Sequence, residues 1–229
     1  MKSEKATAIV CAFNEEHTIG RVIETLLQSP IIDEIIVIND GSFDSTSAVL
    51  KTFKEIPRVR AVESAENRGK GFAMAEGIIH ACNDILVFVD ADLLNLEARY
   101  IDELVQPLLL GLTDMVIGPP TENTLDEKLN PFKPLSGERA LFKKDILPLV
   151  EKIRISRFGV ETLINLYYRS KKKRVLYVPL RGLIHPMKLQ KHSFDRATRE
   201  YSTAVFQIVK TVVKNYSLLL LVVQNIFRR

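Results

Sequence analysis

Short apolar runs alternate with amphipathic runs in the first half of the chain, and this alternation limits the possible folds more than any other feature. The apolar runs occupy residues 7–12, 34–39, 59–63 and 85–89, and each is followed by apolar residues at helical spacing. Continuous apolar strands separated by helices are typical of parallel strands buried on both faces. We therefore predict an α/β fold with a doubly wound, mainly parallel sheet and right-handed crossovers.

Polar side chains follow three of these predicted strands at the point where each strand ends. Asn14 and Glu15 follow the first, Asp40 follows the second, and Asp90 and Asp92 follow the fourth. In an open parallel sheet, ligands bind in the crevice beyond the carboxyl ends of the strands. The sequence therefore predicts one site formed by these side chains.

Asp90 and Asp92, on either side of Ala91, are the candidate metal ligands. Two hard oxygen ligands suit Mg²⁺ or Mn²⁺, which would neutralise a diphosphate and act as a Lewis acid for the departing nucleoside diphosphate. The structural alternative is a solvated acidic turn, which is common after any strand.

Two loops allow both a structural and a functional interpretation. Asp40-Gly41-Ser42 is a turn signal, and we expect residues 42–45 to cap the next helix while Asp40 faces a ligand. Lys70 lies between Gly69 and Gly71 at a predicted helix start, where backbone N–H groups and the helix dipole favour an anion. This loop lacks the spacing of a Walker loop and of a Rossmann fingerprint.

The second half of the sequence is less regular. We predict helices over residues 99–110 and 160–170, strands over 114–118 and 174–179, a proline-rich loop over 119–134, and a helical stretch beginning at Phe194. His185 follows the last strand and precedes Pro186. A lone histidine is more often structural than a ligand, although neutral imidazole can bind Mn²⁺.

Composition narrows the class of protein. The chain has 229 residues, 46% of them hydrophobic, so it can build one sizeable core. Its net charge of +4 is small, and it has neither zinc-ligand spacing nor basic–aromatic interleaving, so we expect no nucleic acid partner. Cys11 and Cys82 lie in apolar runs and are predicted to be buried. The N-terminal segment lacks the apolar core of a signal peptide, which favours a cytoplasmic location.

Four motifs resemble, in order and spacing, the family 2 glycosyltransferases, including the dolichol-phosphate mannose synthase type: residues 12–16 (AFNEE), 37–42 (VINDGS), 67–71 (NRGKG) and 89–93 (VDADL). The resemblance covers about residues 6–120 and implies a GT-A fold with a UDP- or GDP-sugar donor. By this resemblance the nucleotide-sugar contacts are Ala12, Phe13, Asn14, Glu15, Asp40, Lys70, Asp90, Ala91 and Asp92.

The second half resembles a narrower group, the glucosyl-3-phosphoglycerate synthases, at residues 134–138, 158–161 and 180–185. This resemblance implies that His185 is a third metal ligand beside Asp90 and Asp92. It also implies an acceptor and sugar side formed by Ser136, Gly137, Glu138, Arg139, Gly159, Val160 and Glu161. Residues 119–130 depart from the group, because the longer acceptor loop expected there is missing.

Glu161 and Asp92 are the candidate catalytic residues. If the reaction inverts the anomeric centre, a carboxylate must take the acceptor's proton, and Glu161 is then the expected base. If the reaction retains the configuration, no side-chain base is required. The resemblance includes both inverting and retaining enzymes, so both outcomes stay open.

The domain organisation follows from these assignments. Residues 1–213 are expected to form one glycosyltransferase domain, with a nucleotide-sugar half over 1–120 and an acceptor half over 121–213. Residues 214–229 form an apolar and basic helical extension, whose six consecutive aliphatic residues fall short of the roughly 20 that span a bilayer. This tail is a helix docked on the domain, part of a homodimer interface, or a peripheral membrane anchor.

The function expected from the sequence is transfer of a hexose from a nucleotide diphosphate sugar to an acceptor, with Mg²⁺ or Mn²⁺. The acceptor is either a phosphorylated small molecule such as phosphoglycerate or a polyprenyl or dolichyl phosphate at the membrane surface. A sugar-nucleotide nucleotidyltransferase would instead require a glycine-rich basic loop after the first strand, where Asn14 and Glu15 stand. A non-catalytic binding module would be expected to have lost the pair of aspartates.

Overall fold

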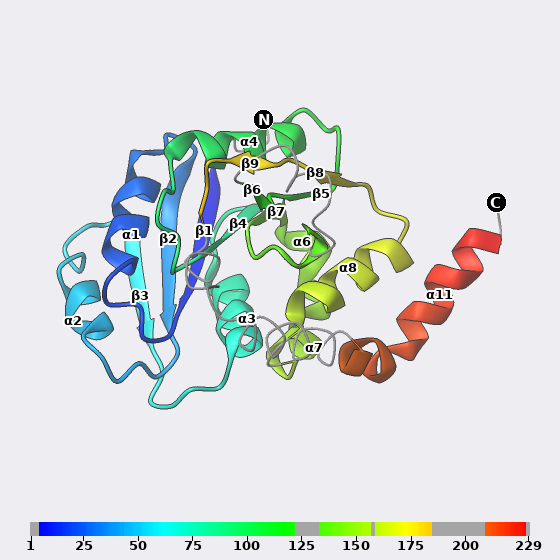
Figure 1. Ribbon diagram of the computed structural model, residues 1–229, viewed down its shortest axis with the longest axis horizontal. Coiled ribbons are helices and arrows are strands. Elements are labelled where there is room, and N and C mark those ends of the chain that lie inside the picture. The colour runs from blue at the N-terminus through cyan, green and yellow to red at the C-terminus, as the bar shows by residue number, and fades with distance from the viewer. Residues whose placement is uncertain (1–4, 122–132, 157–158, 185–208, 228–229) are drawn as a thin grey trace, which may run out of the picture.

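A seven-stranded sheet forms the centre of the computed structural model, which describes residues 5–121, 133–156, 159–184 and 209–227 (Figure 1). The strand order is β3-β2-β1-β4-β7-β5-β8. These strands are β1 (Ala6–Ala12), β2 (Ile32–Asn39), β3 (Val59–Glu63), β4 (Ile85–Asp90), β5 (Met115–Ile117), β7 (Arg139–Phe142) and β8 (Val175–Tyr177). A separate two-stranded sheet pairs β6 (Pro120–Thr121) with β9 (Leu180–Arg181).

The sheet is mainly parallel, as the sequence predicted. Strand β1 pairs in parallel with both β2 and β4, β3 pairs in parallel with β2, and β8 pairs in parallel with β5. Strand β7 is the exception, because it runs antiparallel between β4 and β5. No strand was predicted for residues 139–142, where the structure has β7.

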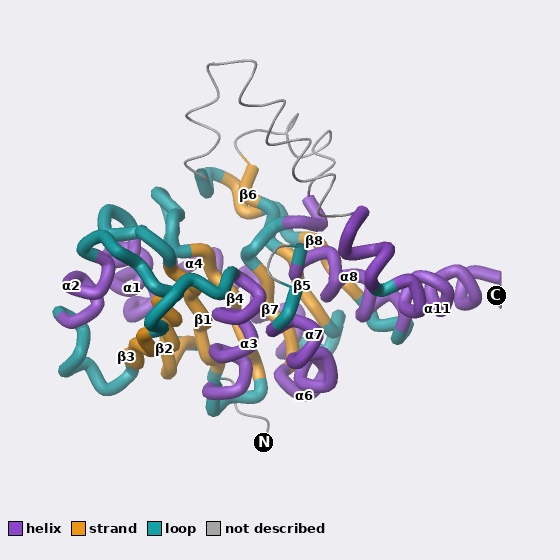
Figure 2. The backbone as a smooth tube through the Cα atoms, turned by 90° about the horizontal axis from the view of Figure 1, so that it is seen from below, coloured by secondary structure: helices purple, strands orange, loops and turns teal. Residues whose placement is uncertain are grey.

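Helices cover both faces of the sheet and make three layers (Figures 1 and 2). One face carries α1 (Ile19–Gln28), α2 (Thr46–Lys51) and α4 (Ala98–Leu109), whereas the other carries α3 (Lys70–His80), α6 (Lys143–Ile146), α7 (Val150–Arg154) and α8 (Val160–Ser170). Short 3-10 turns lie at η1 (Lys133–Leu135) and η2 (Leu147–Leu149). Helix α11 (Tyr216–Phe227) packs outside α8.

Alternation along β1 divides its side chains between the two layers. Ala8 and Val10 belong to the cluster beneath α1 and α4, whereas Ile9 belongs to the cluster beneath α3 and α8. A Cβ atom at Gly77 of α3 would lie 2.3 Å from Cγ2 of Ile9, so only glycine lets α3 approach β1 this closely. The doubly wound prediction is confirmed by this double-sided burial.

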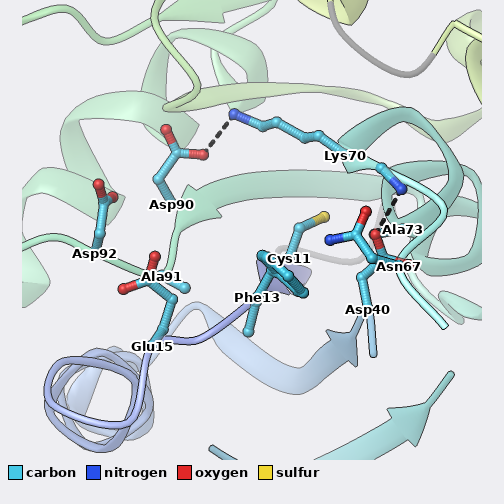
Figure 3. A pocket seen from close by; sticks show the side chains of 12 residues that line it. Cys11, Phe13, Glu15, Asp40, Asn67, Lys70, Ala73, Asp90, Ala91 and Asp92 are labelled. Carbon is cyan, nitrogen blue, oxygen red and sulfur yellow. Dashed lines mark hydrogen bonds and ion pairs between the residues drawn. The ribbon is translucent and has the colours of Figure 1, made fainter. Parts of the chain in front are cut away.

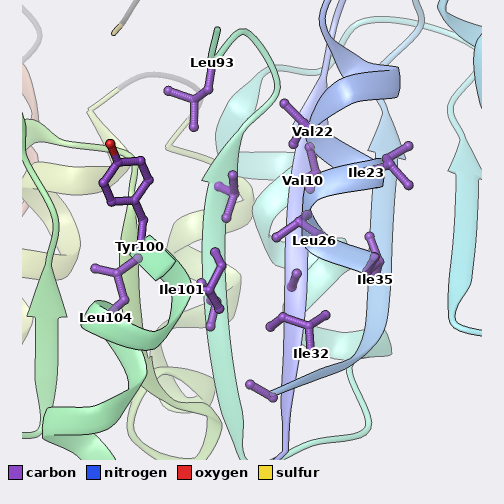
Figure 4. Close-up of a cluster of buried hydrophobic side chains, with 14 of the residues drawn as sticks. Val10, Val22, Ile23, Leu26, Ile32, Ile35, Leu93, Tyr100, Ile101 and Leu104 are labelled. Carbon is purple, nitrogen blue, oxygen red and sulfur yellow. The ribbon is translucent and has the colours of Figure 1, made fainter. Parts of the chain in front are cut away.

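The cluster on the α1 side shows why the first helix forms where it does (Figure 4). Val22, Ile23 and Leu26 recur at helical spacing and are fully buried against Val10 of β1 and Ile35 of β2. Full burial of one such side chain contributes about 1.5–3 kcal/mol. Packing of one apolar face therefore holds this ten-residue helix, which would be marginal in isolation.

The predicted elements agree with the structure within two residues at most ends. The helix at Val160–Ser170 and the strand at Val59–Glu63 were predicted with the observed bounds. One prediction was wrong: Cys82 is exposed after α3, and only Cys11 is half-buried. The stretch from Phe194 lies outside the described residues as far as residue 208. Among the residues described, no helix is long and apolar enough to span a bilayer.

Candidate active site

The direction of winding reverses between β1 and β4, and the candidate site lies at their carboxyl ends. From β1 the chain proceeds to β2 and β3 on one side, and β4 then pairs on the other side of β1. The register aligns Cys11 with Asp90, so the loops after both strands leave the sheet at the same level. Such a switch point is where open α/β sheets bind ligands.

A cavity of about 520 Å³ opens at this point (Figure 3). It is lined by Cys11, Ala12, Phe13, Glu15, Asp40, Asn67, Gly69, Lys70, Ala73, Asp90, Ala91 and Asp92. Eight of the nine residues predicted to contact the nucleotide sugar are in this lining, and Asn14 is the exception. The sequence prediction that these strand ends form one site agrees with this geometry.

Asn14 connects two loops instead of lining the cavity. Its backbone N–H donates to Oγ of Ser42 at 2.9 Å, and its Oδ1 accepts from the backbone N–H of Phe43 at 3.0 Å. Its φ of 58° is left-handed, a conformation that asparagine tolerates better than most residues. Asn14 therefore shapes the loop that presents Phe13, whose ring meets that of Phe43 edge to face at 5.9 Å.

Asp40 organises the loop before α3. Its two carboxylate oxygens accept hydrogen bonds from the backbone N–H groups of Arg68, at 3.0 Å, and Gly69, at 2.6 Å. The buried carboxylate of Asp40, which is 4% exposed, therefore occupies the position at this helix start where the sequence predicted an anion. Before the next helix, Asp44 accepts from the backbone N–H of Thr46 at 2.9 Å, whereas the N-cap residue Ser45 makes no side-chain cap hydrogen bond.

Lys70 joins the two halves of the chain at the floor of the site. Its Nζ lies 2.7 Å from Oδ1 of Asp90 and 2.9 Å from Oε1 of Glu161, the second residue of α8. Burial alone would lower the pKa of Lys70, but the two carboxylates raise that pKa well above its ordinary value. Lys70 is therefore a charged ammonium that holds a predicted metal ligand and the predicted base together.

The carboxylates of Glu15, Asp90 and Asp92 gather on the opposite side of the cavity from Asp40 (Figure 3). Burial, with repulsion from Asp92, Asp44 and Asp90, raises the pKa of Glu15 to about 7, although Thr18 donates a hydrogen bond to it at 3.1 Å. Mutually repelling oxygen ligands of this kind attract a divalent cation. The donor set at Asp90 and Asp92 therefore fits Mg²⁺ or Mn²⁺.

The described residues include no cluster of three or more side chains arranged to hold a metal. His185, the predicted third ligand, lies outside the described residues, as does Phe158 of the second resemblance. The site within the described part of the chain is thus a pair of aspartates with Glu15 nearby.

The loop before β7 presses against the first aspartate. A Cβ atom at Gly137 would lie 2.2 Å from Oδ2 of Asp90 and 2.5 Å from its Cγ and Oδ1, so the loop touches this carboxylate through bare backbone. Ser136 fixes the loop, since its Oγ donates to the carbonyl of Gly118 at 2.9 Å and also contacts Oε2 of Glu138 at 2.5 Å. The Ser136–Gly137 segment therefore lies against Asp90.

Three residues predicted on the acceptor side are buried in this structure. Arg139 is fully buried at the start of β7, Glu138 is 1% exposed, and Val160 packs in the core beneath α8. Their side chains cannot reach an acceptor in this structure, because tertiary packing covers them. Arg139 donates through Nη2 to the carbonyl of Ser136 and so supports the loop from within. Gly159 serves as the N-cap of α8 with a φ of 83°, and Glu161 alone of its segment joins the charged cluster.

Four lining residues were absent from the predicted site: Cys11, Asn67, Gly69 and Ala73. Cys11 was taken for a core residue because it lies inside an apolar run. The available signal was its position one residue before the end of β1, which brings it level with Asp90. Burial raises the pKa of the Cys11 thiol to about 12, so this side chain is an uncharged part of the wall.

Two relatives match about half of the chain. Residues of this chain are 35% identical over 101 positions to 4,4'-diaponeurosporenoate glycosyltransferase of Staphylococcus aureus (strain MRSA252), covering 43% of this chain and 27% of the relative. They are 37% identical over 110 positions to glucosyl-3-phosphoglycerate synthase of Mycolicibacterium paratuberculosis (strain ATCC BAA-968 / K-10), covering 46% of this chain and 33% of the relative. The matches span about a third or less of these relatives.

Solved structures share the fold over most of the chain. A crystal structure of glucosyl-3-phosphoglycerate synthase from Mycobacterium tuberculosis with Mn²⁺, UDP and phosphoglyceric acid has a TM-score of 0.69 at 23% identity, covering 92% of this chain and 78% of that one. A complex of that synthase with Mn²⁺, UDP-glucose and phosphoglyceric acid has a TM-score of 0.67 at 22% identity, covering 90% and 79%. The GT-A fold expected from the motifs is confirmed by this likeness.

The family model for glycosyl transferase family 2 matches residues 7–198, which include the whole cavity and the helix that carries Glu161. On this match, with the shared fold and the converging strand ends, the chain belongs to glycosyl transferase family 2.

Proposed function

We propose that this chain is a metal-dependent glycosyltransferase that moves a hexose from a UDP- or GDP-sugar to an acceptor. The observation that carries the proposal is the cavity at the β1/β4 switch point, where Asp90, Asp92 and Lys70 converge. Its volume of about 520 Å³ is within the range of small-molecule sites. The fold-related synthase complexes with Mn²⁺ and UDP-glucose support this choice of donor and metal.

Asp90 and Asp92 would hold the divalent cation, with His185 as the proposed third ligand. The metal, when bound, supplies positive charge and Lewis acidity to the diphosphate that leaves the sugar. Phe13 lines the cavity beyond β1, where a nucleobase can lie against its ring. The loop at Arg68 and Gly69 lies at the same end of the cavity. Its conformation depends on Asp40, which accepts hydrogen bonds from both backbone N–H groups.

Lys70 and Glu161 are placed for the chemistry at the sugar. Lys70 can shift its ammonium from Asp90 toward a phosphate oxygen, because an anionic ligand competes with the carboxylates for its three N–H donors. Glu161 is 13% exposed and would then be free to orient the sugar or to accept the proton of an acceptor hydroxyl. The base role applies to an inverting reaction, and the orienting role applies to either stereochemistry.

The donor proposal is tested by thermal denaturation with UDP-, GDP- and ADP-sugars, with and without Mn²⁺. A ligand at 100 times its Kd stabilises the native state by about 2.7 kcal/mol, which corresponds to a Tm rise of roughly 5–10 °C for a chain of this size. We expect the rise with a UDP- or GDP-sugar and Mn²⁺, and its loss in Asp92→Asn.

Asp84→Asn is the matched control, because Asp84 is an exposed aspartate just before the other end of β4. It should respond to the ligand like the wild type. The donor site is wrong if no nucleotide raises the Tm, or if Asp92→Asn responds as strongly as Asp84→Asn.

The acceptor is proposed to be a phosphorylated small molecule such as phosphoglycerate, with a polyprenyl phosphate as the second candidate. The synthase relatives and complexes favour the first. The exposed apolar surface of α11 favours the second, since a polyprenyl phosphate resides in a membrane. The test incubates the protein with a radiolabelled nucleotide sugar, Mn²⁺ and each acceptor in turn. Label in a water-soluble product indicates the phosphorylated small molecule, and label in a product extracted by organic solvent indicates the polyprenyl phosphate.

A further inference from the structure

Helix α11 has two apolar faces, and only one of them is covered. Leu218 is 8% exposed and belongs to the buried cluster that also contains residues of α8, and Asn225 on the same face donates through Nδ2 to the carbonyl of Ser170 at 2.9 Å. Tyr216, Leu220 and Val223 share another face at helical spacing and are 66%, 54% and 39% exposed. The helix is therefore docked along one side and bare along another, at the outer edge of the molecule (Figure 1).

Exposed apolar side chains also lie on the short helical segment that precedes α11. Residues 209–214 are also helical, and Val209 and Val213 are 53% and 65% exposed. Contiguous exposed apolar side chains of this extent mark an interaction site more often than scattered ones do. Helix α11 itself extends about 18 Å at 1.5 Å per residue, and a turn at Asn215 separates it from the helical residues 209–214.

Charge complementarity selects the partner. Residues 201–229 contain no aspartate or glutamate, and the exposed Lys210 and Lys214 accompany the apolar face. The hydrogen bond from Asn225 to Ser170 brings the end of α11 to the C-terminal turn of α8, where Arg169, Lys171 and Lys172 are exposed. An apolar strip with basic residues at both ends fits an anionic lipid surface.

A second copy of this chain fits the same face less well. Helices that associate through such a strip usually place acidic and basic side chains beside it, so that the two partners attract. Here a copy would bring lysines to lysines, because its own segment 201–229 has no acidic residue. The positive charge beside the strip therefore opposes self-association and favours an acidic partner.

We propose that the bare face of residues 209–223, with the basic turn at Arg169–Lys172, binds the surface of an anionic membrane while the helix lies parallel to it. Tyr216, Leu220 and Val223 would enter the boundary between headgroups and acyl chains, and the lysines would contact lipid phosphates. Helix α8 carries Glu161 near its other end, about 14 Å from Ser170 at 1.5 Å per residue. The surface thus holds the candidate site one helix length from the lipid, whichever acceptor the site uses.

Vesicle flotation of the full chain tests the proposal. Vesicles of phosphatidylcholine with about 30% phosphatidylglycerol are compared with vesicles of phosphatidylcholine alone, at low and at high salt. We expect at least tenfold stronger partition to the anionic vesicles, falling steeply with salt because the basic contacts are screened. Lys210→Gln/Lys214→Gln should weaken partition on the order of tenfold.

Two double variants with the same charge change separate the faces of α11. Leu220→Glu/Val223→Glu places charge in the bare strip and should abolish flotation. Ser217→Glu/Gln224→Glu places the same charge on exposed polar positions of the same helix and should keep most of it. Circular dichroism and the Tm of each variant show that it is folded.

Three results would overturn the proposal. The first is an absence of flotation on anionic vesicles at low salt. The second is equal loss in both double variants, which would mean that net charge alone governs binding. The third is a dimer by light scattering that dissociates in Leu220→Glu/Val223→Glu without any vesicle binding, which would assign the face to a second copy. Nucleotide binding in free solution is a separate measurement, so failure here leaves the donor site untouched.

Discussion

Lys70 contacts two carboxylates that come from opposite halves of the chain. Asp90 belongs to β4 and Glu161 to α8, and the ammonium lies within 2.9 Å of both. With 30% of its side chain exposed, Lys70 is partly shielded from water, so its charge matters more than that of a surface lysine. At the residue scale, this group ties the acceptor half to the donor half.

Replacing Lys70 by glutamine should destabilise the fold by about 1–3 kcal/mol, because two carboxylates would then face each other without a cation. Chemical denaturation measures the loss, and Lys51→Gln on the exposed side of α2 is the control that should change little. The double variant Lys70→Gln/Glu161→Gln should lose less than the two single variants together, since one repelling charge is gone. If the losses of stability in the two single variants simply added up in the double variant, Lys70 and Glu161 would not be coupled.

Glu15 should make stability depend on pH near neutrality. Its pKa in the folded chain is raised to about 7 from 4.5, so the folded state prefers the protonated form. This contribution is fully present below pH 4.5 and is lost as pH rises through about 7. Glu15→Gln should therefore raise the Tm at pH 8, by an amount equivalent to about 1 kcal/mol after allowance for solvent screening, and change it little at pH 5.

The exposed Glu55→Gln provides the control, because it alters the same charge away from the cavity. Mn²⁺ bound at Asp90 and Asp92 should lower the pKa of Glu15 and reduce the gain seen at pH 8. A Tm difference that is the same at pH 5 and pH 8 would contradict the raised pKa.

Strand β7 is the element that completes the site. Because it runs antiparallel between β4 and β5, the loop at its start turns back over the carboxyl end of β4. That direction brings Gly137 against Asp90 and buries Arg139 in the sheet. A parallel strand in the same place would begin beside the amino end of β4, and the loop before it would not reach Asp90.

Gly137→Ala tests this element-level contact. The added methyl group would overlap the carboxylate of Asp90, and relieving the overlap should cost about 1–3 kcal/mol of stability and reduce the Mn²⁺-dependent Tm rise. Gly20→Ala is the matched control, since its new methyl would meet only a Val49 side-chain atom at 3.4 Å within α1, where alanine is favoured. Equal stability and an equal Mn²⁺-dependent Tm rise in the two variants would mean that the loop moves away from Asp90 at no cost.

At the scale of the whole molecule, the sheet is strongest at its centre. Strand β1 is paired on both sides and almost wholly buried, whereas β8 is an edge strand of the sheet in the described part of the chain, with Leu176 and Tyr177 exposed. Amide hydrogen exchange should therefore be at least roughly 100-fold slower in β1 and β4 than in β8, because the centre opens only on global unfolding. Comparable rates in β1 and β8 would contradict a sheet that is more stable at its centre than at its β8 edge.

Much of the fold was predictable because the information for it is local. A continuous apolar run predicts a buried parallel strand, and the helical spacing of apolar residues such as Val22 and Leu26 predicts an amphipathic helix. Strand β7 was missed because its four residues lie beside polar neighbours and resemble a loop. Cys82 was predicted to be buried because it lies in an apolar run, but it is exposed in the loop between α3 and β4.

The sequence by itself determined the order of strands and helices, and it placed Asn14, Asp40 and the aspartate pair at strand ends. Those features follow from periodicity and from the rule that carboxyl ends of parallel strands share an edge. Only the tertiary structure decided that Lys70 bridges Asp90 and Glu161, that Asp40 binds its own chain, and that Arg139 is buried. Each depends on a contact between segments far apart in the chain, and such a contact is set by packing and strand pairing, which no local pattern specifies.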